Sequence, residues 1–98
     1  MVNYIDDLAC KIYILSEGRP VAVDDDLTLY RIYAVLALAK GEDTTAEDVH
    51  NAWAAWTAGN RPRHRSLVPF SELSPEVQAL DEPYVQAIRR AATTEAEA

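Results

Sequence analysis

The sequence of 98 residues has little cysteine, glycine or positive charge, and these shortages exclude several classes of protein. Its single cysteine, Cys10, can form neither an internal disulfide nor a cysteine zinc site, which excludes the disulfide-stapled secreted proteins. Its three glycines are scattered, so no glycine-rich phosphate loop is present. The longest apolar stretch, residues 32–39, is far shorter than the roughly 18–20 residues that span a bilayer. We therefore expect no membrane-spanning segment.

Positive charge is scarce and gathers in one place. The chain has 16 acidic and 9 basic residues, a formal charge of −7, and only residues 59–65 are clearly basic, with three arginines and no acid. An acidic domain without a basic stripe is a poor candidate for nucleic-acid binding, because phosphate neutralisation supplies most non-specific affinity. Residues 1–7 also lack the basic opening and the hydrophobic run of a secretory signal. We expect a cytoplasmic protein that does not bind nucleic acid.

Apolar residues recur with helical spacing in the first half of the chain. The first such segment runs from Ile5 to Leu15. Asn3 can cap its start, and Gly18 follows its end. The second segment, residues 27–40, is apolar nearly all round, which predicts that it is the central and most buried helix.

Two further helices are predicted in the second half. The third segment begins where Thr44 with Glu47, or Thr45 with Asp48, can form a capping box. The fourth begins after Ser74, which is followed by a proline at the first helical position. A second proline lies inside this fourth segment and predicts a kink or break near residues 81–82, with Asp81 capping the part that follows.

These segments predict an all-α fold, a compact bundle of about four helices in one domain over residues 1–92. An ordered loop rich in proline and arginine, residues 60–70, joins the third and fourth helices. Residues 93–98 have no large apolar side chain, so we expect a disordered tail. Because a chain of this size buries only a thin core, association into a homodimer would add stability.

The residues that could perform catalysis or bind metal form no known pattern. Residues 24–26 are all aspartates, but they lack the alternating ligands and glycine of a calcium loop, which favours a solvated helix N-terminus. His50 has no second ligand at a suitable spacing, which favours a packed, hydrogen-bonded histidine. A hydrolase or transferase would need His50 to meet Cys10 or a carboxylate in one pocket. We therefore expect no enzyme, no metal and no cofactor.

One group of residues is typical of a ligand site. Trp53 and Trp56 lie on the predicted third helix. They are followed at once by Arg61, Arg63, His64 and Arg65. Aromatic faces stack on planar rings, and guanidinium groups bind phosphate through paired hydrogen bonds, so the group predicts a site for a nucleotide-like or other phosphorylated molecule. The alternative is that the tryptophans anchor the core and the arginines are solvated.

Three stretches together resemble the RyR repeat domain, which is named for ryanodine receptors and also occurs in bacterial and phage proteins. They are DVHNAW at residues 48–53, LVPFSELS at residues 67–74, and Leu80-Asp81 with Val85. The resemblance covers about residues 46–90 and leaves residues 1–45 as a separate helical pair. It implies a two-helix unit with an ordered connection and the motif residues His50, Trp53, Pro69, Phe70 and Asp81.

In the RyR family, paired repeats can accept ligands such as adenine nucleotides in the cleft between them. The resemblance therefore implies that a chain with one repeat forms a homodimer to build such a cleft. The short arginine-rich segment 57–66 departs from the family, whose members usually carry a longer insert at this point. Any ligand contact that the family makes through that insert does not carry over to this chain.

Two functional hypotheses follow. The first is a non-enzymatic binding module, a homodimer that recognises a nucleotide-like or other phosphorylated small molecule through the tryptophans and arginines. The second is a small acidic protein of the kind that phages and mobile elements encode to bind a host protein. In the second case residues 24–26 and the acidic helix faces would form the contact, and residues 61–65 would not.

Overall fold

The computed structural model describes residues 3–97, which form α-helices, two short 3-10 turns and no β-strand. The helices are α1 (Tyr4–Glu17), α2 (Thr28–Lys40), α3 (Ala46–Asn60), α4 (Pro75–Ala79) and α5 (Glu82–Glu97). The 3-10 turns are η1 (Gly41–Asp43) and η2 (Phe70–Glu72). The predicted all-α bundle is confirmed, with the fourth predicted helix divided into α4 and α5.

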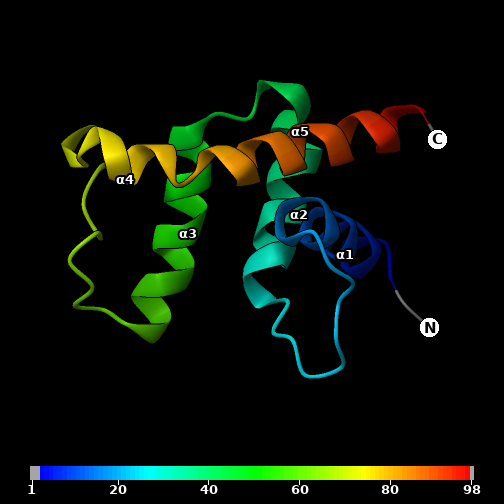
Figure 1. The fold of residues 1–98 in the computed structure, drawn as a ribbon, viewed down its shortest axis with the longest axis horizontal. Helices are drawn as coiled ribbons and strands as arrows, with labels where there is room; N and C mark the ends of the chain where they lie inside the picture. The colour runs from blue at the N-terminus through cyan, green and yellow to red at the C-terminus, as the bar shows by residue number, and fades with distance from the viewer. Residues whose placement is uncertain (1–2, 98) are drawn as a thin grey trace.

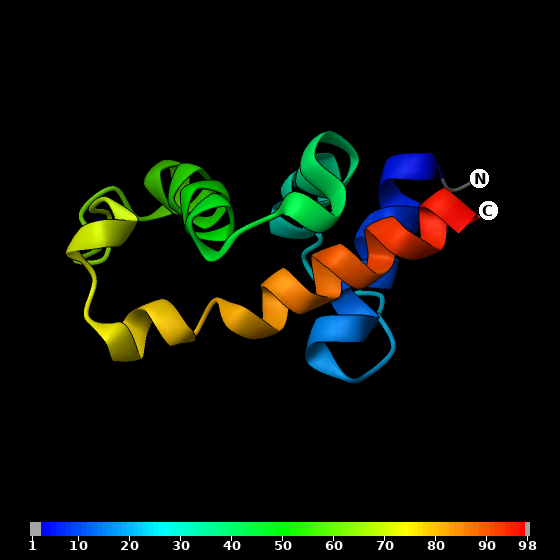
Figure 2. The same cartoon turned by 90° about the horizontal axis from the view of Figure 1, so that it is seen from above.

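The last helix contacts every other long helix. In Figure 1, α5 crosses the upper part of the molecule in front of α2 and α3, and α1 lies below it. The view from above in Figure 2 shows α5 passing alongside α3, α2 and α1 in turn. Residue contacts join α5 to all three, and α2 contacts both α1 and α3. The fold is therefore completed by the end of the chain packing back onto its beginning.

Helix boundaries follow the capping residues of the sequence. The Asn3 side chain accepts a hydrogen bond of 2.8 Å from a backbone N–H in the first turn of α1, and Gly18 ends that helix at a φ of 72°. Thr45 and Asp48 form the capping box of α3, through bonds of 3.2 and 2.9 Å. The Ser74 hydroxyl caps α4. These predicted caps are confirmed.

The break between α4 and α5 lies where the internal proline predicts it. Pro83 occupies the first turn of α5, where a backbone N–H has no partner inside the helix and its loss is tolerated. The backbone carbonyl of Asp81 accepts the N–H groups of Tyr84 and Val85, at 3.1 and 3.0 Å. Asp81 thus starts α5 through its backbone, which leaves its carboxylate unused.

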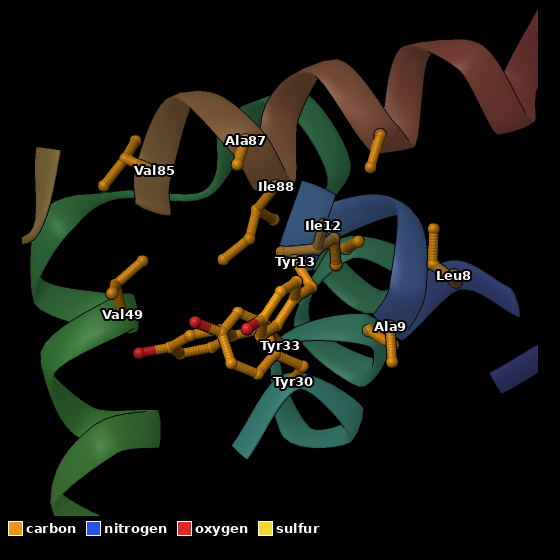
Figure 3. Packing of buried hydrophobic residues seen from close by; sticks show 13 residues of the cluster. Leu8, Ala9, Ile12, Tyr13, Tyr30, Tyr33, Val49, Val85, Ala87 and Ile88 are labelled. Carbon is orange, nitrogen blue, oxygen red and sulfur yellow. The ribbon is translucent and has the colours of Figure 1, made fainter. Parts of the chain in front are cut away.

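The core lies between α1, α2 and α5 and receives one valine from α3 (Figure 3). Its buried members are Leu8, Ala9, Ile12, Tyr13, Tyr30, Tyr33, Ala34, Ala37, Val49, Val85, Ala87, Ile88 and Ala91. The hydroxyls of Tyr30 and Tyr84 both donate to Glu17, at 2.7 and 3.1 Å. The central position of α2 is confirmed, but Val35 and Leu38 are more than half exposed, so its burial is one-sided.

Residues 93–97 belong to a stretch for which the sequence predicts a disordered tail. Helix α5 continues to Glu97. The Thr93 hydroxyl donates to Glu42 at 3.0 Å, and the Arg89 guanidinium donates to the Thr44 carbonyl at 2.8 Å. These polar contacts with η1 and the residue after it hold the last turns of α5, although the tail lacks large apolar residues. Ala98 lies outside the described residues.

Candidate functional site

A cavity of about 360 Å³ lies where α2, α3, the loop after α3, α4 and the start of α5 meet. It is lined by Leu29, Tyr33, His50, Trp53, His64, Ser66, Leu73, Val77, Leu80, Asp81 and Tyr84. The volume falls within the range of roughly 300–1,000 Å³ that small-molecule sites have. The lining joins aromatic and aliphatic side chains with a few polar groups, which is the composition typical of such sites.

A larger hollow of about 500 Å³ lies between α1, α2 and α5, and its lining has no aromatic side chain and few polar ones. Its polar lining side chains are Glu42 and Thr93, and these two are hydrogen-bonded to each other. The cavity beside Trp53 is therefore the better candidate for a ligand site.

His50 anchors the loop after α3 to the helix itself. It is buried, and its Nε2 lies 2.7 Å from the carbonyl oxygen of Val68. Because a carbonyl only accepts, Nε2 must carry the proton in this bond. The imidazole stacks beside Trp53 with ring centroids 5.7 Å apart, and the Phe70 ring lies 6.1 Å away. The prediction of a packed, hydrogen-bonded histidine is confirmed.

His64 also contacts Trp53. Its Nδ1 accepts the backbone N–H of Ser66 at 3.0 Å, so the neutral ring has its proton on Nε2. The two rings meet edge to face, with centroids 5.1 Å apart and an angle of 86° between their planes. The Trp53 indole therefore contacts two imidazoles, each of which forms a hydrogen bond with the backbone.

Asp81 contributes the one carboxylate of the cavity. Within residues 3–97, no donor forms a hydrogen bond or an ion pair with it. Burial raises the pKa of the Asp81 carboxyl above its ordinary value, and the proximity of His50 acts in the opposite direction. A partly buried carboxylate without a partner in a cavity is a candidate functional group.

The structure divides the group of residues predicted to bind a phosphorylated ligand. Trp53 and His64 line the cavity together. The other members, Trp56, Arg61, Arg63 and Arg65, do not line it. The three arginines are exposed, and Trp56 is half-buried on α3. The arginines thus lie on the same loop as His64 but outside the cavity wall.

The predicted motif residues also separate. His50, Trp53 and Asp81 line the cavity, and Phe70 is half-buried against His50. Pro69 is exposed and precedes η2, so it does not pack between two helices. Tyr33 and Tyr84 line the cavity although the sequence analysis did not select them. Their spacing marks them only as core residues of their helices.

His50 and Asp81 both line this cavity, so a histidine and a carboxylate share one pocket, as a hydrolase or transferase would need. Cys10 does not line the cavity. Among the side chains described between residues 3 and 94, no group of three or more His, Cys, Asp or Glu is placed to hold a metal ion. In the same part of the chain, every helix is too short or too polar to cross a membrane.

These features define a small all-α domain with an aromatic cavity at the junction of its second, third and fifth helices. A family model described as Domain of unknown function (DUF7701) matches residues 3–93, and the chain belongs to this family. No curated protein and no solved structure matches the chain.

The resemblance to the RyR repeat is wrong. The family model that matches includes the whole of residues 46–90, the part on which the resemblance depended, and it describes a different family. The shared residues have a local explanation, because His50 contacts both Trp53 and Phe70 and bonds to the Val68 carbonyl. The expectation of a ligand cleft between two paired repeats therefore has no support. A homodimer stays a prediction that depends on the small core alone.

Proposed function

We propose that the protein is a cytoplasmic, non-enzymatic binding module that holds a small molecule with an apolar or aromatic body in the cavity beside Trp53. The observation that carries the proposal is the cavity of about 360 Å³, whose lining includes Tyr33, Trp53 and Tyr84. Aromatic walls with a few convergent polar groups are the usual composition of small-molecule sites.

The rigidity of the wall supports the same proposal. His50 and His64 are each held by a backbone hydrogen bond, and both contact Trp53. A wall whose side chains are already ordered loses little conformational freedom when a ligand binds, which favours affinity.

Hydrogen bonding in the cavity favours binding over catalysis. Activation of a nucleophile requires a base within hydrogen-bonding distance of it. His50 uses its Nε2 for the Val68 carbonyl. Among the described residues, no hydrogen bond joins His50 to Asp81 or to the Ser66 hydroxyl.

A phosphorylated ligand stays a prediction with weaker support than the cavity itself. Arg61, Arg63 and Arg65 are exposed and do not line the cavity. A phosphate that they bind would therefore lie outside, on the loop that carries His64, while the rest of the molecule occupies the cavity.

The alternative role, an acidic protein that binds a host protein, has less support at the edge predicted for it. Asp25 is paired with Arg19 at 3.0 Å and accepts a backbone N–H at 2.7 Å. Asp26 accepts the Thr28 N–H at 2.8 Å. Two of the three aspartates at residues 24–26 are thus engaged within their own loop, which leaves fewer free charges for a partner.

The proposal is tested by NMR chemical-shift mapping with small ring compounds that are neutral, cationic or phosphorylated. We expect compounds that bind to shift the amide signals of cavity residues such as Trp53 and His64. Trp53→Leu should abolish these shifts. Trp56→Leu is the matched control, because Trp56 lies on the same helix outside the cavity.

Two results would overturn the proposal. One is that no compound of any charge shifts the cavity signals. The other is that Trp53→Leu leaves binding unchanged while the variant remains folded. If only phosphorylated compounds bind, and Arg63→Ala weakens their binding, the result supports the prediction of a phosphorylated ligand.

A further inference from the structure

Asp81 is exceptional among the residues that surround the candidate cavity. Of the eleven lining residues, it alone is acidic, because the others are aliphatic, aromatic, hydroxyl-bearing or histidine. Its carboxylate has no hydrogen bond or ion pair among the described residues. A desolvated charge without a partner is costly, so a group that brings a positive charge into the cavity would relieve that cost.

The aromatic side chains of the cavity favour the same kind of group. Tyr33, Trp53 and Tyr84 all line it. The faces of tyrosine and tryptophan rings carry negative electrostatic potential and attract organic cations within about 6 Å of the ring centre, more strongly where water is excluded. Several aromatic rings around one space are how proteins recognise alkylammonium groups.

Charge outside the cavity acts in the same direction. The chain carries a formal charge of −7, which raises the local concentration of cations around it. The arginines at positions 61, 63 and 65 do not line the cavity, and no lysine does. His64 accepts a backbone N–H through Nδ1, so this ring nitrogen is already engaged within the loop. Within the lining, therefore, no arginine or lysine competes for Asp81.

We propose that the cavity is a site for a small organic cation, an alkyl- or arylalkylammonium group held by Asp81 and surrounded by Tyr33, Trp53 and Tyr84. The inference depends on the proposed function, since it names the chemical class of the molecule that the cavity binds. It assigns Asp81 as the residue that selects the charge of the ligand and the rings as the residues that provide its apolar contacts.

The test compares three compounds that share a benzyl group and differ in charge: benzyltrimethylammonium, its neutral carbon isostere neopentylbenzene, and benzyl phosphate. Binding is followed by tryptophan fluorescence in a Trp56→Phe background, which leaves Trp53 as the reporter. We expect the cation to bind at least about tenfold more tightly than the neutral isostere, since a charge pair and cation–π contacts together contribute on the order of a tenfold change or more.

The variant Asp81→Asn should remove this preference by weakening the binding of benzyltrimethylammonium. Glu76→Gln is the matched control, because Glu76 is an exposed acid on α4 outside the lining, and its loss changes the net charge equally. Asp81→Asn should also fold well. Because burial raises the pKa of this carboxyl, its charged form opposes folding near neutral pH, and an uncharged amide should raise the melting temperature.

Three outcomes would overturn the cation proposal. If neopentylbenzene binds as tightly as the cation and Asp81→Asn changes neither, the cavity binds small molecules without selecting charge, and the proposed function stands. If benzyl phosphate binds most tightly and Arg63→Ala removes that advantage, the ligand is phosphorylated. If none of the three changes the fluorescence of Trp53, the cation proposal fails, and the proposed function then depends on the wider NMR screen.

Discussion

Replacing Val49 by alanine is a direct test of how α3 packs against the rest of the domain. Val49 is fully buried, with an exposed fraction of 0%, and it is the one member of the buried core cluster that α3 supplies. Val35 on α2 offers a matched control, since it is 56% exposed and also lies inside a helix. The two substitutions make the same chemical change, and any gain in helix propensity is the same for both.

The magnitude follows from burial. Removing two buried methyl groups forfeits about 1.6 kcal/mol of transfer free energy, at about 0.8 kcal/mol each. The space left behind adds to this cost, and the better helix propensity of alanine returns about 0.5 kcal/mol. We expect Val49→Ala to lower the free energy of unfolding by about 1.5–3 kcal/mol. In a domain of this size, that loss lowers the melting temperature by roughly 6–20 °C. Val35→Ala should stay within about 0.5 kcal/mol of the wild type.

Urea unfolding followed by circular dichroism, at two protein concentrations about tenfold apart, measures both variants. If the two cost the same within about 0.5 kcal/mol, burial does not separate Val49 from Val35 and the described packing of α3 is refuted. A cost of Val35→Ala that grows with protein concentration would instead indicate that a second copy of the chain covers the exposed face of α2.

Two further predictions concern the ion pair of Asp25 with Arg19 and the backbone at two glycines. Arg19 and a backbone N–H lower the pKa of Asp25 from 3.8 to about 2, so this pair stabilises the fold above pH 3.8 and loses its contribution as the pH falls toward 2. Arg19→Gln should therefore flatten the dependence of the free energy of unfolding on pH in that window, as an acid titration can show. Gly41 has a φ of 57° and a ψ of −127°, so Gly41→Ala should destabilise by about 1–2 kcal/mol. Gly59→Ala, inside α3 with open space around it, should stabilise by about 0.5–1 kcal/mol. Equal effects at the two glycines in thermal unfolding would contradict this reasoning.

Helices could be predicted from this sequence because their signals are local. The cap at Asn3, the capping box of Thr45 with Asp48, and the break before Pro83 each depend on residues within one turn of one another. Apolar spacing likewise indicates which side of a helix is buried. Apolar spacing does not indicate which other helix the buried side packs against. A cavity that joins Tyr33 of α2 to residues of α3, α4 and α5 therefore cannot be predicted from any short stretch of the sequence.

The arginine loop shows a second limit of the sequence. The backbone N–H of His64 bonds to the carbonyl of Arg61, and the carbonyl of His64 accepts from Leu67, which folds the loop into successive turns. Within these turns His64 accepts the Ser66 N–H and faces Trp53, while its neighbours Arg63 and Arg65 are exposed. These side chains are neighbours in the sequence, but the turns of the loop direct His64 toward Trp53 and leave Arg63 and Arg65 exposed.

The position of α5 has a consequence for synthesis of the chain. Val85, Ile88 and Ala91 of this helix are part of the buried cluster, and α5 contacts α1, α2 and α3. A ribosome releases the first three helices before it has made the element that covers them. Until then, apolar side chains such as Ile12 and Val49 lack part of their burial, and a nascent chain in this state can bind chaperones or aggregate. Folding of the whole domain therefore waits for the last helix to emerge.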